Sequence, residues 1–333
     1  MNIIRRKRLK RGDQCAILIL FCGFLLLWVL GMFDHLWETS FDDFRWPPYG
    51  VNVLSEVERA TISGKLSAFT VNDPRALQYK AVPKCNTKGK EELLIIVKSA
   101  VSNEKQRDAI RRTWGSRQHQ EGASTIFVVG DTTDGGLQSN LEEEILANDD
   151  ILHVDFLDSY RNNTRKFVHS IKYAFERGNG CRSPKFLLLV DDDYIVNTAD
   201  LVHYVSRADS SRHLYEGWMF DTTPFRFRLH KHAVSLEMYP FDRYPTYISA
   251  GAVLMSQHTF SYFYYAMQMV QMYPFDDIYA GILAHLLHIP PKHNEAFVFW
   301  TRTVSVDEWK RGAVLAAHGY SPDQIIKYFP LLS

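Results

Sequence analysis

The chain has 333 residues, of which 46% are hydrophobic, 14% aromatic and 23% charged, and this globular composition excludes disordered and collagen-like proteins. Lysine plus arginine and aspartate plus glutamate both number 38, which argues against a general nucleic-acid binder, since such proteins usually carry a basic excess. The length fits one large domain or two small ones.

The N-terminal segment predicts a membrane anchor. Residues 1–14 form a basic tail with six basic side chains and one acid, and residues 15–33 carry no charge. A run of about 20 apolar residues crosses a hydrocarbon core of ~30 Å. The positive-inside rule puts the basic tail in the cytosol and the bulk of the chain in the lumen, as in a single-pass type II protein. A cleaved secretory signal peptide is the alternative, although its apolar stretch is usually only about 7–15 residues long.

The remaining cysteines agree with a lumenal location. Cys85 and Cys181 are the two cysteines outside the apolar run. In an oxidising compartment they predict a disulfide, and two unpaired buried thiols are the alternative. Asn162 begins an Asn-Asn-Thr glycosylation sequon, which is usable only in a lumenal chain.

Residues 34–90 show little periodicity and predict a stem, and the pattern changes at residue 91. From there short apolar runs alternate with helical patterns, which indicates an α/β domain over residues 91–333 with a mostly parallel sheet and helices on both faces. Residues 210–333 predict an irregular, loop-rich half. The expected strands are residues 93–97, 124–129, 151–156 and 186–190, and the expected helices are residues 103–114, 141–147, 165–177 and 198–206.

Three carboxylates, Asp191, Asp192 and Asp193, directly follow the apolar run 186–190. Ligands of open α/β sheets bind outside the carboxyl ends of strands. Packed carboxylates repel one another unless a cation neutralises them, and oxygen ligands suit Mg²⁺ or Mn²⁺. The pattern therefore favours a metal that also holds the phosphates of a nucleotide. A solvated acidic turn is the alternative.

A second acidic pair, Asp276 and Asp277, lies between apolar and aromatic residues. A partly buried carboxylate has a raised pKa and can serve as a general base. Aspartates that cap the start of a helix are the alternative, and the two roles are compatible.

Five motifs in order resemble the inverting β1,3-glycosyltransferases of the secretory pathway, the family of β1,3-galactosyl- and β1,3-N-acetylglucosaminyltransferases. They lie at residues 107–115, 155–166, 190–197, 247–252 and 276–281. In addition, residues 234–247 are similar to the invertebrate Brainiac-type branch and its nematode relatives, a branch associated with extending a mannosyl-glucosyl ceramide core.

The resemblance implies a Rossmann-like nucleotide-sugar glycosyltransferase fold with one site for Mn²⁺ or Mg²⁺. Asp191 and Asp193 are implied as metal ligands, with His318 as an extra ligand and Asp192 close to the ribose or sugar. Asp277 is implied as the general base. The reaction implied is inverting transfer of N-acetylglucosamine or galactose from a UDP-sugar to a glycolipid or glycoprotein acceptor in the Golgi membrane.

Further residues of this chain are expected to bind the sugar donor and the acceptor. Arg107 and Arg111 share a helix face at i,i+4 and suit phosphate contacts, although a solvated basic face is the alternative. Lys166 belongs to a family motif, which implies a place near the donor. Flat aromatic rings pack against sugar faces, so the expected acceptor residues are Trp218, Tyr239, Tyr244 and Tyr247, unless these rings belong to the core.

Two other functions compete with this reading. The pattern of Asp191 and Asp193 after an apolar strand resembles the first motif of haloacid-dehalogenase-like phosphatases, but Pro274 makes a poor strand before the second acidic pair. A lumenal lectin without catalysis is the other alternative. The histidines His285, His288 and His293 show no clear zinc-ligand pattern.

Overall fold

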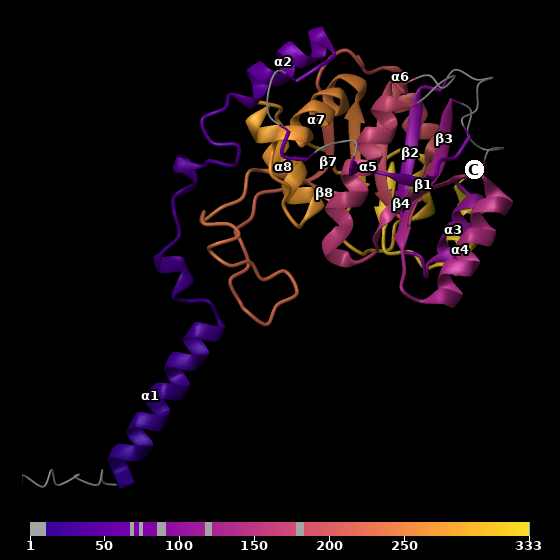
Figure 1. The fold of residues 1–333 in the computed structure, drawn as a ribbon. Helices are drawn as coiled ribbons and strands as arrows, with labels where there is room; N and C mark the ends of the chain where they lie inside the picture. The colour runs from indigo at the N-terminus through magenta and orange to yellow at the C-terminus, as the bar shows by residue number, and fades with distance from the viewer. Residues whose placement is uncertain are drawn as a thin grey trace, which may run out of the picture. The chain divides into compact units, whose positions relative to one another are not determined.

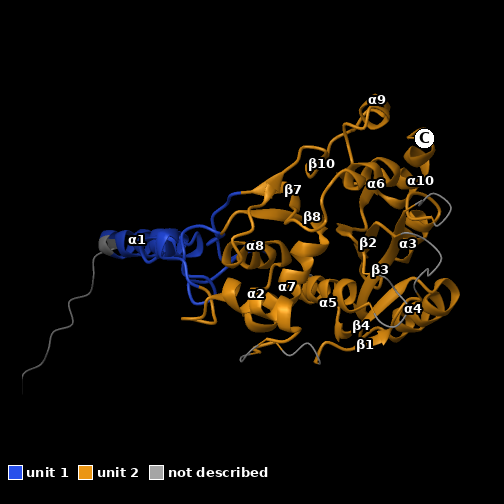
Figure 2. Ribbon diagram, turned by 90° about the horizontal axis from the view of Figure 1, so that it is seen from above, with its two compact units in different colours: residues 1–45, 221–244 blue, residues 46–220, 245–333 orange. Residues whose placement is uncertain are grey.

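The computed structural model describes residues 11–66, 70–72, 76–84, 91–116, 122–177 and 183–332. The chain divides into two compact units (Figure 2). Residues 1–45 and 221–244 form unit 1, and residues 46–220 and 245–333 form unit 2. Cys85 and Cys181 lie outside the described residues, so the expected disulfide stays a prediction.

Unit 1 combines the helix α1 (Arg11–Val29), two short 3-10 helices, η1 (Asp34–Leu36) and η2 (Phe41–Asp43), and the loop of residues 221–244. Arg226 organises the loop from within, because its buried guanidinium donates to the carbonyls of Val234, Tyr239 and Phe241 and pairs with Glu38 at 2.7 Å. Of the helices in the described ranges, none combines the length and apolarity that crossing a membrane requires.

Unit 2 alternates strands and helices over most of its length (Figure 1). Its strands are β1 (Tyr79–Ala81), β2 (Leu93–Lys98), β3 (Ala123–Asp131), β4 (Ile151–Leu157), β5 (Phe186–Asp191), β6 (Tyr194–Val196), β7 (Tyr215–Phe220), β8 (Tyr247–Ser256), β9 (Lys292–His293), β10 (Phe297–Val298) and β11 (Ala316–His318). Its helices are α2 (Val53–Ser63), α3 (Glu104–Arg111), α4 (Gly135–Asn148), η4 (Tyr160–Asn162), α5 (Asn163–Glu176), α6 (Thr198–Ser206), α7 (Gln257–Met269), α8 (Asp276–Leu286), α9 (Val306–Lys310), α10 (Pro322–Tyr328) and η5 (Phe329–Leu331).

The main sheet has the strand order β1-β4-β3-β2-β5-β8-β7-β9. The strands β4, β3, β2 and β5 run parallel, whereas β8 is antiparallel to both β5 and β7, and β1 is antiparallel to β4. The sheet is therefore mixed, because β1 and β8 run against the other strands while β9 pairs parallel with β7, and the expectation of a mostly parallel sheet fails at β1 and β8. A helical crossover returns a chain in the parallel sense, but residues 221–246 join β7 to β8 without a helix.

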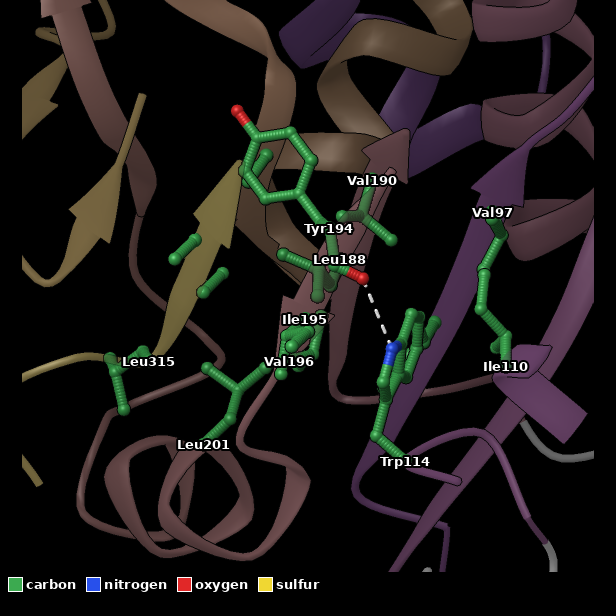
Figure 3. Close-up of a cluster of buried hydrophobic side chains, with 14 of the residues drawn as sticks. Val97, Ile110, Trp114, Leu188, Val190, Tyr194, Ile195, Val196, Leu201 and Leu315 are labelled. Atoms are coloured by element: carbon green, nitrogen blue, oxygen red, sulfur yellow. Dashed lines mark hydrogen bonds between the residues drawn. The ribbon is translucent and has the colours of Figure 1, made fainter. Parts of the chain in front are cut away.

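Both faces of the sheet are covered, as the unbroken apolar runs predict. Every residue of β2 is buried, and so are the first five residues of β5. Viewed from above, α5 and α7 lie on one side of β2 and β3, and α6 and α10 lie on the other (Figure 2). On the latter side the cluster in Figure 3 packs side chains of β2, α3, β5 and α6 around the buried Trp114, whose indole N–H donates to the carbonyl of Tyr194 at 3.1 Å.

The structure confirms the four expected strands and four expected helices, with one helix longer than expected. Helix α4 begins at Gly135 rather than Leu141, because the carboxylate of Asp134 accepts the backbone N–H groups of Gly136 and Leu137 and caps the helix there.

Both ends of the predicted catalytic domain carry regular structure. Part of the expected stem is folded into unit 2, since α2 packs on α7 with Val57 fully buried, and β1 extends the sheet beside β4. Residues 210–333 are also more regular than expected, because β8 takes a central place in the sheet and α7 and α8 cover it. Many aromatic side chains of this half are core residues.

Candidate active site

Four neighbouring parallel strands end at one edge of the main sheet, and charged side chains stand at that edge. Lys98, Asp131 and Asp191 are the last residues of β2, β3 and β5, and Asp158 directly follows β4. This is the edge at which open α/β sheets bind ligands. A cavity of about 470 Å³ opens there, lined by Lys98, Ser99, Ala100, Val101, Ser102, Asp131, Thr132, Leu137, Asp158, Ser159, Asn163, Lys166, Asp191, Asp192 and Asp193.

Lys98 joins the two acidic clusters that the sequence analysis singled out. Its Nζ lies 3.0 Å from Asp191 Oδ1 and 2.8 Å from Asp276 Oδ2, and the residue is only 6% exposed. Burial lowers the pKa of Lys98, but the two carboxylates together outweigh burial and raise it above the usual value. A protonated ammonium group therefore bridges the start of α8 and the end of β5.

The first two carboxylates after β5 are held by the protein itself. Burial raises the pKa of Asp191 to about 6, against the attraction of Lys98 and with added repulsion from Asp276 and Asp193. Burial also raises the pKa of Asp192, whose Oδ2 accepts hydrogen bonds from Ser99 Oγ at 2.7 Å and Asn103 Nδ2 at 2.9 Å. Asp192 thereby ties the loop that follows β2 to the end of β5.

Asp193, unlike Asp191 and Asp192, contacts the C-terminal strand β11. The antiparallel pairing of β6 with β11 sets His318 opposite Tyr194, and His318 Nε2 lies 3.1 Å from Asp193 Oδ2. The Asp193 carboxylate raises the pKa of His318. The backbone carbonyl of Asp193 also accepts the N–H groups of Gly319 and Tyr320, so the two segments hold each other in place.

The donor set at Asp193 fits a divalent cation. Its Oδ1 is buried and has no hydrogen-bond partner among the described residues, an arrangement that costs free energy unless a cation or a hydrogen-bond donor arrives. Carboxylate oxygens suit Mn²⁺ and Mg²⁺, and a neutral imidazole is a common metal ligand. Over the described ranges, no three or more His, Cys, Asp or Glu side chains are grouped so that they could hold a metal ion.

Asp277 stands at the start of α8, next to Asp276. Burial, followed by the charge of Asp276, raises the pKa of Asp277 to about 7, although its Oδ1 accepts the Ile278 backbone N–H at 2.8 Å. Phe275 is the N-cap of α8 and no side chain caps the helix there, so Asp277 contacts only the first turn, and a raised pKa is what a general base requires.

The position of α8 depends on a close contact with β8. A Cβ atom added to Gly281 would lie 2.6 Å from the Cβ of Tyr247. Only a glycine lets the helix approach the strand this closely, and this approach brings Asp276 within reach of Lys98. The two last motifs of the sequence analysis therefore meet in space.

The structure gives the two arginines of α3 a different task from the expected phosphate contact. Arg107 is fully buried, and its guanidinium donates to Glu144, Ser99 Oγ and the carbonyls of Ala100 and Val101. Arg111 pairs with Glu144 and Asp150, at 2.7 and 2.8 Å. Neither arginine lines the cavity. Arg107 instead stabilises the loop of residues 99–101 after β2 through its hydrogen bonds to that loop.

Lys166 lines the cavity, but its ammonium group is already engaged. It is 3% exposed, and its Nζ lies 2.7 Å from Asp158 Oδ1 and donates to the carbonyl of Ser99 at 2.8 Å.

The four expected acceptor aromatics do not form one group. Tyr239 and Tyr244 are buried inside unit 1, with ring centroids 4.6 Å apart, whereas Trp218 and Tyr247 belong to unit 2. Tyr247 is buried and Trp218 is half-buried on β7. The three buried tyrosines correspond to the core alternative, and Trp218 has the most accessible ring of the four.

The expected glycosylation residue, Asn162, ends the short helix η4 just before α5. Its side-chain Nδ2, the atom that a glycan would modify, donates to the carbonyl of Leu157 at 2.7 Å. A glycan on this nitrogen would replace one of its two hydrogens, so a single N–H would remain to donate.

Lys98 and Asp158 are cavity residues that were not predicted from the sequence. One signal for Lys98 was present, because it is the first charge after the apolar run of β2, just as Asp191 is after β5, and the two residues are register partners. Asp158 stands inside a motif of the expected family, but no pattern in the sequence distinguished it from Asp155.

The chain is similar to known glycosyltransferases over most of its length. Residues 105–295 match the family described as Galactosyltransferase. The chain is 38% identical to beta-1,3-galactosyltransferase bre-5 of Caenorhabditis elegans, over 96% of this chain and 94% of that protein. It is 33% identical to beta-1,3-galactosyltransferase brn of Drosophila melanogaster, over 83% of this chain and 82% of that protein. The human UDP-GalNAc:beta-1,3-N-acetylgalactosaminyltransferase 1 is 32% identical, over 72% and 74% respectively.

Proposed function

Because the chain belongs to the galactosyltransferase family and is a glycosyltransferase, we propose that it transfers a hexose from a UDP-sugar to a glycan hydroxyl, in β1,3 linkage and with inversion. The observation that carries the proposal is the bridge of Lys98 between Asp191 and Asp276. It links a carboxylate cluster suited to a cation, which lines the cavity, to the start of α8, where the carboxylate suited to a base stands.

The names of the relatives support galactose as the transferred sugar, since two of them are called beta-1,3-galactosyltransferases. N-acetylglucosamine is the alternative that the sequence motifs support. For the acceptor we propose a glycolipid with a mannosyl-glucosyl core, with glycoprotein glycans as the alternative, because residues 234–247 carry the resemblance to the branch that extends such cores.

Asp277 is the proposed general base. The acceptor oxygen attacks the anomeric carbon, the bond from that carbon to the diphosphate oxygen breaks, and the acceptor proton passes to Asp277. A single displacement inverts the configuration and leaves UDP as the product.

Asp277 must be ionised to accept the proton, so transfer is expected to fall as the pH drops through about 7, the pKa of its carboxyl group.

Asp193 and His318, with Asp191 close by, are the proposed ligands of a divalent cation, Mn²⁺ or Mg²⁺. When bound, the ion supplies positive charge beside the departing diphosphate. Ions of this kind are often held by one or two carboxylates together with substrate phosphates. Asp192 and Lys166 keep the surrounding loops in position through Ser99.

We further propose that the protein is a type II membrane protein of the Golgi, with residues 1–14 in the cytosol, residues 15–33 in the membrane and the remainder in the lumen. The basic tail and the uncharged apolar run support this orientation.

Replacing Asp277 with asparagine is expected to reduce transfer by a factor of about 10²–10⁴, which is the usual contribution of general-base catalysis. Binding of UDP is expected to persist, because the Asp277 side chain does not line the cavity. The assay incubates the protein with Mn²⁺, a panel of UDP-sugars and several acceptors, and analyses the product linkage. Asp108→Asn, an exposed aspartate on α3, is the matched control. Full turnover by the Asp277 variant would refute its assignment as the base.

Replacing Asp193 with alanine is expected to remove the effect of Mn²⁺ on UDP binding. In the wild type, Mn²⁺ should strengthen UDP affinity about tenfold or more, or at least ~1.4 kcal/mol. Calorimetric titration of UDP with Mn²⁺ and with a chelator measures the difference, and His318→Ala should show a smaller loss. If Asp193→Ala keeps the full metal effect, the cation is bound elsewhere.

Full-length protein expressed in animal cells is expected to stay in the membrane pellet after alkaline carbonate extraction, because its apolar segment would be embedded in the bilayer. A variant that lacks residues 1–33 should enter the supernatant. Release of the full-length chain by carbonate would contradict the proposed anchor.

A further inference from the structure

Asp158 carries a second carboxylate oxygen that no described residue satisfies. Its Oδ1 lies 2.7 Å from Lys166 Nζ, whereas its Oδ2 is buried and has no hydrogen-bond partner. The side chain is only 10% exposed and lines the cavity. Leaving such an oxygen without a hydrogen bond costs free energy. A ligand that carries an N–H or O–H group would satisfy it.

The orientation of Asp158 is fixed from three sides. Lys166 is anchored on the carbonyl of Ser99 at 2.8 Å, and the Asp158 backbone N–H donates to the carbonyl of Asp131 at 2.8 Å. A Cβ atom on Gly130 would lie 3.1 Å from the Asp158 Cβ and 2.8 Å from the Phe156 carbonyl oxygen. The aspartate is thus pre-organised before any ligand arrives.

The place of Asp158 in the sheet indicates which part of the ligand it meets. Strands β4, β3, β2 and β5 are parallel neighbours, so Asp158 after β4 and Asp191 at the end of β5 are three strand spacings apart, roughly 14 Å along the edge. A diphosphate held at Asp193 therefore leaves its nucleoside to extend toward β3 and β4. An ionised carboxylate repels phosphates, which also excludes them as its partner.

We propose that Asp158 Oδ2 accepts a hydrogen bond from the nucleoside of the donor, either from the N3–H of uracil or from a ribose hydroxyl. The inference rests on the proposed use of UDP-sugars. An ionised carboxylate only accepts hydrogen bonds, and uracil carries a proton on N3 where cytosine has a lone pair. If uracil is the partner, Asp158 distinguishes UDP from CDP.

The test is Asp158→Asn in the full chain, with binding of UDP, CDP and 2′-deoxy-UDP followed by calorimetry in Mn²⁺. Asparagine keeps an oxygen for Lys166 and presents an NH₂ group where Oδ2 was, so UDP affinity should fall about tenfold or more. The wild type should prefer UDP over one of the two analogues, and the variant should lose that preference. Loss of the CDP discrimination identifies the base, and loss of the 2′-deoxy-UDP discrimination identifies the ribose.

Two further variants keep the test decisive. Asp155→Asn, an exposed aspartate on β4 that does not line the cavity, should leave UDP affinity within about twofold. Gly130→Ala displaces Asp158 without altering its charge and should weaken UDP in the same nucleoside-dependent way. A folded Asp158→Asn protein with wild-type affinity and discrimination would overturn the inference. A wild-type protein that binds no UDP would instead refute the proposed function.

Discussion

The site depends on one buried ammonium group. Lys98 ends a strand whose other side chains are all apolar, and it is placed between carboxylates that belong to different parts of the chain. Without a cation between them, Asp191 and Asp276 would repel each other in a poorly solvated region, and both segments would be pushed apart. The link between the end of β5 and the start of α8 therefore depends on the charge of Lys98 as well as on the close packing of Gly281 against Tyr247.

This arrangement divides the carboxylates by task. Asp191 and Asp276 are neutralised by Lys98, and Asp192 is satisfied by Ser99 and Asn103. Asp193 and Asp158 each retain one buried oxygen that has no hydrogen-bond partner in the described part of the chain, and both residues line the same cavity. The protein thus satisfies the carboxylates that shape the site and leaves oxygens open at the two positions that we propose for cation and nucleoside. Asp277 follows Asp276 in the first turn of α8, and burial together with the charge of Asp276 raises the pKa of its carboxyl group to about 7.

Much of the framework could be predicted from the sequence because buried strands appear as short apolar runs with charges at their ends. The pairing of Lys98 with Asp191 could not, since it requires the register of β2 against β5, which no local pattern encodes. The i,i+4 spacing of Arg107 and Arg111 indicated a shared face but not its surroundings, and Glu144 on α4 turned that face into a buried ion-pair cluster. Residues 46–84 lack a strong period, yet α2 and β1 fold against unit 2 through tertiary contacts.

The most direct test of this account replaces Lys98 with methionine and measures the free energy of unfolding together with sugar transfer. We expect the free energy of unfolding to fall by about 3–5 kcal/mol, because the buried Asp276 and the partly exposed Asp191 lose their cation, and transfer to fall below the detection limit. Adding Asp276→Asn should restore part of the stability by removing one of the two charges, but it should not restore transfer. A Lys98→Met protein with wild-type stability and wild-type turnover would contradict the central role of this residue.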